Sequence, residues 1–294
     1  MKKIKWFIIL ILIVGAVGAG FWFKKDILKM SEGFETSVDK IQNIDVGSVV
    51  SETSRKVLTA DPLNVGGKSN SVTLLKSKII EETNNQRITN GLPALKENVL
   101  LYNAAAAKAN DMFTSQYFEH ISPTGVDPGT LVLTYGYEYI ITGENLILGN
   151  FKSEAEMVQD WMNSPGHRAN ILNASYAEIG VSVIKGIYKG ETVWIAVQEF
   201  GLPLSVCAEP DQDLKNQIEI NQSQLGQLAE NLDERKSQID GVGKNSSYYN
   251  DMVDAYNEKV AEYNSLAGKL KSQVQNYNKQ ANYFNDCVAA AQGE

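Results

Sequence analysis

The central part of the chain carries two helical patterns followed by two strand patterns. Residues 72–89 repeat apolar side chains at helical spacing, and residues 98–116 do the same around an alanine-rich centre. A further helix is expected to begin at Ser153, whose side chain can cap it together with a glutamate three residues later. Residues 178–188 and 191–200 are rich in β-branched side chains and predict a β-hairpin. Helices that precede a small, mainly antiparallel sheet indicate a layered α+β domain.

Beyond residue 211 the apolar side chains recur every seven residues. One set runs to residue 240, and a second set begins after the glycine-containing segment Gly241–Ser247. Two heptad helices around a short break predict an antiparallel coiled-coil hairpin, which we assign to residues 203–294. A single long helix that pairs with a second copy of the chain is the alternative, and self-association through the coiled coil stays open.

The first 30 residues predict a membrane anchor. Lysines flank an uncharged run of 18 residues from Trp6 to Phe23, which is long enough to span a bilayer. The small residues Val17-Gly18-Ala19 also fit a signal-peptidase site, so a cleaved signal segment is the alternative. We favour an N-terminal transmembrane helix in residues 1–30 and expect residues 31–71 to form a juxtamembrane spacer.

Composition and cysteine count narrow the function classes. A net charge of −8 argues against a nucleic-acid-binding protein, which normally has a basic surface. The chain has two cysteines, Cys207 before the first heptad helix and Cys287 near the end of the second. Because the hairpin returns the chain to its base, we predict a Cys207–Cys287 disulfide, with two free thiols as the alternative.

Only two histidines occur in the chain, and both lie in short motifs rich in turn-forming residues. The motifs are Tyr117–Gly125 (YFEHISPTG), Gly143–Leu146 (GENL) and Ser164–Leu172 (SPGHRANIL). They contain His120, Glu144 and His167, and Glu144 interrupts an otherwise strand-like run over residues 139–148. Two imidazoles and a carboxylate suit a divalent metal such as zinc, or proton transfer near neutral pH. Their spacing requires the fold to bring them together.

These motifs, followed by EIGVSV and VWIAVQEFG, resemble the CAP superfamily of SCP-like (cysteine-rich secretory, antigen 5, pathogenesis-related) domains in its bacterial extracellular form. The resemblance implies a three-layer α-β-α sandwich for residues 72–202 and an extracytoplasmic location. It also implies a cavity lined by two histidines and two acids. His120, His167 and Glu144 match three of these positions, while the fourth, three residues after Trp161, holds Ser164.

The expected function is therefore that of a membrane-anchored extracytoplasmic CAP-domain protein. It would be a single-pass protein of the cell membrane, or a secreted one if the N-terminal segment is cleaved. A cell-envelope ligand or protein partner would bind in a cavity formed by His120, Glu144, Ser164 and His167, and His120 and His167 would hold a weakly bound divalent cation, zinc before others. One alternative is a metal-assisted hydrolase of extracellular peptides or cell-wall material in which Glu144 is catalytic and activates water. Another is a lipid or small-molecule binder. Whether the protein is an enzyme stays open because the fourth acid is missing, and no nucleic-acid partner is expected.

Overall fold

The computed structural model describes residues 55–67, 71–244 and 246–293, so the predicted anchor in residues 1–30 lies outside the described residues. Among the helices that are described, none is both long and apolar enough to cross a bilayer. The described residues divide into two compact units. The first, here called the domain unit, comprises residues 55–214 and 275–293, and the second, the helical unit, comprises residues 215–274.

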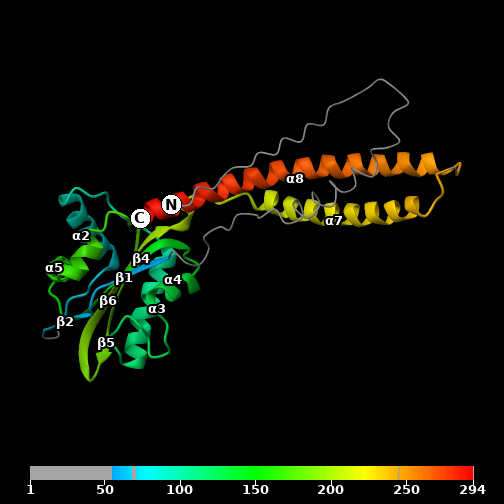
Figure 1. The fold of residues 1–294 in the computed structure, drawn as a ribbon. Coiled ribbons are helices and arrows are strands. Elements are labelled where there is room, and N and C mark those ends of the chain that lie inside the picture. Colours follow the sequence, from blue (N-terminus) through cyan, green and yellow to red (C-terminus); the bar gives the residue numbers. More distant parts are fainter. Residues whose placement is uncertain (1–54, 68–70, 245, 294) are drawn as a thin grey trace, which may run out of the picture. The chain divides into compact units, whose positions relative to one another are not determined.

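A mixed sheet forms the centre of the domain unit (Figure 1). Its strand order is β1-β4-β6-β5-β3, and β2 also pairs with β4. The strands are β1 (Lys56–Thr59), β2 (Leu63–Gly66), β3 (Lys96–Glu97), β4 (Tyr139–Gly149), β5 (Glu178–Tyr188) and β6 (Glu191–Pro203). Strands β4, β6 and β5 are antiparallel, whereas β1 and β2 run parallel to β4. The predicted hairpin is confirmed: Lys189 and Gly190 join β5 to β6 with φ values of 48° and 88°, which match the twist of the flanking strands.

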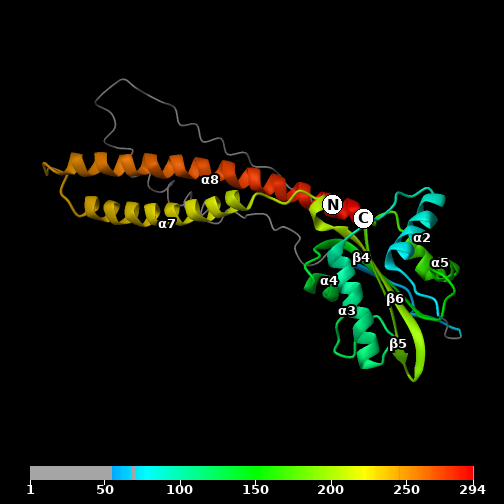
Figure 2. The ribbon, with the colours of Figure 1, turned by 180° about the vertical axis from the view of Figure 1, so that it is seen from behind.

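Helices cover both faces of this sheet, so the domain has three layers (Figure 2). They are α2 (Lys76–Thr89), α3 (Val99–Ser115), α4 (Pro128–Thr134), α5 (Glu154–Asn163) and α6 (Pro165–Ile171). Successive residues of a strand point to opposite faces. Accordingly, Ile147 of β4 packs in one core with residues of α2 and α5, while its neighbours Leu146 and Leu148 pack in another core with residues of α3. Two apolar cores therefore hold β4 between layers, and every residue of this strand is buried.

Local capping explains where the helices begin. The Asn98 side chain accepts hydrogen bonds from the backbone of Leu100 and Leu101, and the Ser153 hydroxyl accepts one from the backbone of Glu156. The helix expected over residues 72–89 begins only at Lys76. His167 lies within α6, although its motif is rich in turn-forming residues. Proline at the first helical position favours a new helix because its fixed φ is already helical.

The expectation of a spacer over residues 31–71 is wrong for its C-terminal part. Residues 56–66 contribute β1 and β2, which pair with β4 in the sheet. Each strand has only four residues, too few to show a clear alternation in the sequence. Their position depends on a partner strand about 80 residues later in the chain, which no local pattern reveals.

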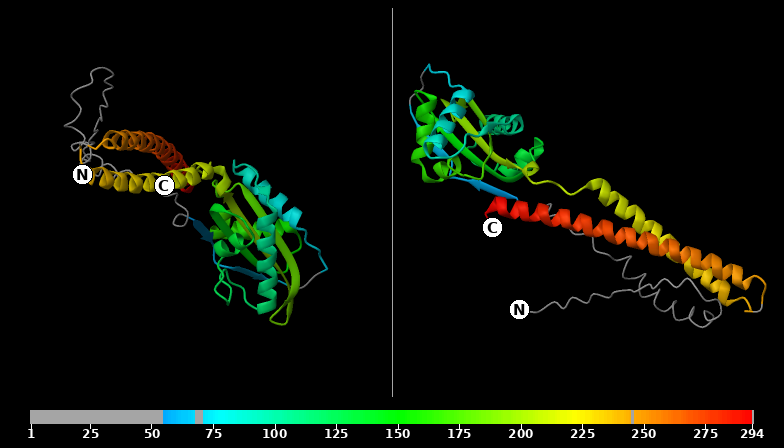
Figure 3. Two further views of the ribbon diagram at one scale, coloured as in Figure 1. Left: turned by 90° about the vertical axis from the view of Figure 1, so that its right-hand side faces the viewer. Right: turned by 90° about the horizontal axis from the view of Figure 1, so that it is seen from above.

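Two long helices, α7 (Gln212–Asp240) and α8 (Tyr249–Gln292), follow the sheet. In the helical unit the chain reverses between them, and they run alongside each other (Figures 1 and 3). Their predicted apolar seams are buried, at Ile218, Leu225 and Leu232 in α7 and at Tyr263, Ala267, Leu270 and Val274 in α8. A buried Asn221 interrupts the seam of α7, and its amide donates to Gln273 Oε1 of α8 at 2.6 Å. A single polar pair of this kind fixes the register of two helices.

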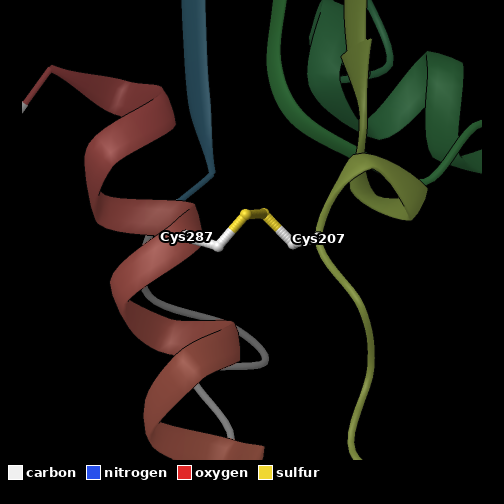
Figure 4. Close-up of a disulfide and its surroundings, with 2 residues drawn as sticks. All are labelled: Cys207 and Cys287. Atoms are coloured by element: carbon white, nitrogen blue, oxygen red, sulfur yellow. A yellow bond between two sulfur atoms is a disulfide. The ribbon is translucent and has the colours of Figure 1, made fainter.

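The predicted disulfide is confirmed within the domain unit (Figure 4). Cys207 follows the short 3-10 helix η1 (Leu204–Val206) and bonds to Cys287 of α8, with the two Cα atoms 5.8 Å apart. Phe284 and Val288 of α8 are buried in the same core cluster as Cys207. The last turns of α8 are therefore part of the domain core and are covalently attached to it.

Candidate functional site

The structure places the predicted site residues at the side of β4 that faces β1 and α6. Glu144 lies in β4, Ser164 and His167 lie at the start of α6, and His120 lies in the loop after α3. They form two hydrogen-bonded pairs, His120 with Glu144 and Ser164 with His167. Asn145 connects them, because it follows Glu144 in β4 and its amide donates to the His167 carbonyl at 3.2 Å.

His120 is held between two oxygen acceptors. Its Nδ1 lies 2.6 Å from Glu144 Oε1, and its Nε2 contacts the carbonyl oxygen of Ala60, just beyond β1. Burial alone would lower the pKa of His120, but the hydrogen bond and charge of Glu144 and the Ala60 carbonyl raise it above the ordinary value. Both ring nitrogens can donate at once only in the protonated imidazolium, so this geometry favours the charged form.

A buried lysine fixes the loop that carries His120. Lys108 of α3 is 3% exposed, and its Nζ donates to the His120 carbonyl at 2.5 Å. Burial lowers the pKa of Lys108, and the nearby carboxylates of Glu144 and Glu199 oppose that effect. Lys108 therefore brings a positive charge close to the two acids and holds the His120 backbone in place.

Glu199 is a candidate site residue that the sequence motifs did not identify. It lies in β6 directly opposite Glu144 of β4, and both side chains are completely buried. Burial raises the pKa of Glu199 well above the ordinary value, and the neighbouring charge of Glu144 raises it further. Two carboxylates would both be acceptors and would repel each other, so a proton on Glu199 relieves the repulsion between them. The signal was present in the sequence: like Glu144, Glu199 is an acid within an apolar strand.

His167 has an environment opposite to that of His120. It is 1% exposed, and its Nδ1 lies 2.8 Å from Ser164 Oγ. Its Nε2 is buried without a well-formed hydrogen bond in the described structure. Burial and then the positive charge of His120 lower the pKa of His167 to about 4, although the Leu146 backbone and Asp61 partly oppose this. His167 is therefore a neutral imidazole near pH 7, beside a charged one.

An amide network holds the backbone of the site. Asn170 of α6 donates to the Glu144 carbonyl at 3.2 Å and to Asn145 Oδ1 at 3.0 Å. Asn145 also donates to Gln198 Oε1, and Gln198 donates to Thr83 of α2. This chain of hydrogen bonds joins α6, the sheet and α2, so the positions of the two pairs depend on the whole domain.

Zinc binding by His120 and His167 stays a prediction. The described residues contain no group of three or more His, Cys, Asp or Glu side chains arranged to hold a metal ion. Both ring nitrogens of His120 already have protein partners, and Nδ1 of His167 is engaged by Ser164. A metal ligand needs a free nitrogen lone pair, and of the four ring nitrogens only His167 Nε2 lacks a hydrogen-bond partner, so the two histidines as placed do not form a two-histidine cation site.

The central part of the chain is similar to a known protein family. Residues 80–200 match the model of the CAP family, the cysteine-rich secretory protein family. Similar proteins of Bacillus subtilis (strain 168) are the uncharacterized protein YkwD, 38% identical over 45% of this chain and 51% of YkwD, and the uncharacterized membrane protein YlbC, 28% identical over 40% of this chain and 33% of YlbC. The matches therefore span about half or less of these relatives.

Two solved structures are also similar to part of the chain. An extracellular protein of Bacillus anthracis str. Ames that contains an SCP domain is 28% identical, with 43% of this chain and 39% of that chain covered and a TM-score of 0.37. An outer surface protein from Borrelia burgdorferi is 21% identical, with 43% of this chain and 91% of that chain covered and a TM-score of 0.38.

Proposed function

Because this chain carries a CAP domain of the cysteine-rich secretory protein family, we propose that it is an extracytoplasmic envelope protein that binds a ligand or partner through that domain. The binding site is the cluster formed by His120, Glu144, Ser164 and His167, to which Glu199 is added. The helical unit would present this domain or associate with a further protein.

The observation that carries this proposal is the concentration of incompletely paired polar groups inside the domain. Glu144 Oε2, both oxygens of Glu199 and His167 Nε2 are buried without a hydrogen-bond partner of ordinary geometry, even though the two acids can share a proton. Burying such groups costs stability unless they are paired. Interior clusters of this kind are typical of sites that bind or transform a ligand.

The envelope location is supported by chemistry and by a relative. The Cys207–Cys287 disulfide suits an oxidising compartment outside the cytoplasm. The similar Bacillus subtilis protein YlbC is named a membrane protein. An anchor in residues 1–30 would retain the chain at the membrane with the domain outside.

Binding measurements with the full chain test this proposal. The probes are cell-wall glycan fragments, lipid vesicles and envelope proteins, and we expect at least one of them to bind the wild type. Its affinity for the double variant His120→Ala/His167→Ala should be at least about ten-fold weaker, because each ~1.4 kcal/mol of lost contact corresponds to a ten-fold change. The matched control is Tyr248→Ala, which alters an exposed residue just before α8 in the helical unit. Equal binding by wild type and double variant for every ligand would contradict the assignment of the site.

Hydrolysis at the same cluster is the second candidate, and one observation favours it. Ser164 Oγ lies within hydrogen-bond distance of His167 Nδ1, as an activated serine requires. The lowered pKa of His167 makes it a weak base at neutral pH, which opposes this role. The test is turnover of peptide and cell-wall substrates by the wild type against Ser164→Ala, and turnover that survives this substitution would remove Ser164 as the nucleophile.

A further inference from the structure

A short segment that precedes the family match in the sequence lies against the candidate site. This N-terminal strap, residues 55–66, contains β1 and β2 and precedes the matched residues 80–200. It adds to the free edge of β4 in parallel, with Thr59 opposite Glu144 and Lys56 opposite Ile141. The strap thus runs along the strand that carries the GENL motif, as an extended peptide does when it adds to a sheet edge.

The contacts of the strap with the site are those of a bound peptide. The Ala60 carbonyl contacts His120 Nε2, and the Leu58 carbonyl accepts from the amide of Asn170 at 3.4 Å. The Ala60 side chain lies against Gly166 of α6, where a Cβ on Gly166 would be only 2.8 Å from Ala60 Cβ. The strap therefore presents two backbone carbonyls and one methyl side chain to the site.

Backbone pairing holds the strap more than side-chain burial does. Lys56, Val57 and Thr59 are exposed, Leu58 and Leu63 pack partly against the core, and the short side chain of Ala60 is buried. At the N-terminal end, Arg55 forms an ion pair with Glu138 at 2.6 Å, with side chains 31% and 58% exposed. Exposed ion pairs contribute little to stability. An extended segment from another chain can make the same main-chain bonds, so the strap and such a segment can compete.

We propose that the edge of β4 beside His120 and Asn170 is a binding site for an extended polypeptide segment, and that residues 55–61 are an intramolecular occupant of it. The partner segment pairs in parallel with β4, places a small residue against Gly166 and directs its carbonyl to His120. A basic residue five positions earlier meets Glu138, as Arg55 does in the strap. This inference rests on the proposed ligand-binding function and specifies its ligand as a peptide.

The test uses a fluorescein-labelled peptide with the sequence of residues 55–61, RKVLTAD, and the full chain with altered straps. In the first variant, Ala60→Phe, the bulky ring cannot fit against Gly166 and displaces the strap, while Gly166 itself is unchanged for the peptide. The matched control is Thr59→Phe, which adds the same ring at an exposed position of the same strand. Leu63→Asp is a second displacing variant that weakens β2 and leaves residue 60 intact, in case Ala60→Phe does not fold.

Fluorescence anisotropy should show the peptide binding a displaced variant at least ~10-fold more tightly than the wild type or Thr59→Phe, because a tethered strap competes at an effective concentration near the millimolar range. A peptide with phenylalanine in place of its alanine should not bind. Equal binding of the peptide to all variants, or no binding to any folded displaced variant, would overturn the inference. If an envelope ligand still bound through His120 and His167 in that second case, the proposed function would stand and the peptide assignment alone would fail.

Discussion

Removal of the Cys207–Cys287 disulfide is expected to destabilise the domain unit strongly. The variant is Cys207→Ala/Cys287→Ala in the full chain. Alanine is chosen because Cys207 is 1% exposed and a serine hydroxyl there would be buried in an apolar core. Phe284 and Val288, which flank Cys287 on α8, insert into the same core. The bond therefore holds apolar packing between segments that are distant in the sequence.

The magnitude follows from the length of chain that the bond closes. The two cysteines are 80 residues apart in the sequence. In the chain-entropy model, a loop of this length lowers the entropy of the unfolded chain enough to stabilise the fold by about 4.5 kcal/mol. With a urea dependence of about 2 kcal/mol per molar, its loss corresponds to a midpoint lower by about 2 M.

The assay is urea unfolding of the variant, of the oxidised wild type and of the wild type in reductant, followed by near-ultraviolet circular dichroism. Hydrogen exchange of residues 275–293 is measured in parallel, and these amides should lose protection in the variant because their covalent attachment is gone. The reduced wild type should unfold with the variant. Midpoints of oxidised wild type and variant within about 0.3 M would refute the reasoning, since they would mean that packing alone holds the end of α8.

Three further predictions concern buried groups. His167 takes up a proton in the unfolded chain that the folded domain excludes, so the free energy of unfolding should fall by up to about 3 kcal/mol as pH drops from about 6.5 to about 4. The His167 NMR signal should therefore not titrate above pH 5, and titration of both histidines near 6.5 would contradict this. Glu199 keeps a proton in the folded state that the unfolded chain loses above about pH 4.5, so the stability that this group contributes is lost as pH rises. Glu199→Gln should therefore raise the urea midpoint at pH 7.5 but not at pH 4.5, and a lower midpoint at pH 7.5 would contradict this prediction. Gly180→Ala should lower the free energy of unfolding by about 3 kcal/mol in thermal melts, because a Cβ there would lie 2.1 Å from the backbone nitrogen of Tyr102 in α3. The control Gly268→Ala has open space around it within α8 and should instead raise stability by up to about 1 kcal/mol, so destabilisation by both substitutions alike would contradict the prediction.

Periodic patterns in the sequence determined the helices and strands whose apolar side chains recur at regular spacing. The helix over α3, the hairpin of β5 and β6, and the buried seams of α7 and α8 all agree with the structure, because apolar spacing decides which face of a regular element leaves water. The disulfide also followed from the sequence, since a chain reversal between two helices brings their distant ends together.

Only the tertiary structure decided the surroundings of the candidate site. The motifs identified His120, Glu144, Ser164 and His167, but not that the two histidines have opposite pKa shifts, which depend on burial and on neighbours from other elements. The sequence shows Glu199 as an acid in an apolar strand, but only the pairing of β6 with β4 places it opposite Glu144.

The strap shows most clearly what the sequence alone does not determine. Residues 56–66 have the composition of a linker, and four-residue strands carry no period that can be read locally. Their structure comes from main-chain hydrogen bonds to β4, which any sequence with an extended backbone can make. Side-chain patterns determine which faces are buried, whereas the pairing of strand edges and the environment of buried charges are set by residues far apart in the chain, and these were decided by the fold alone.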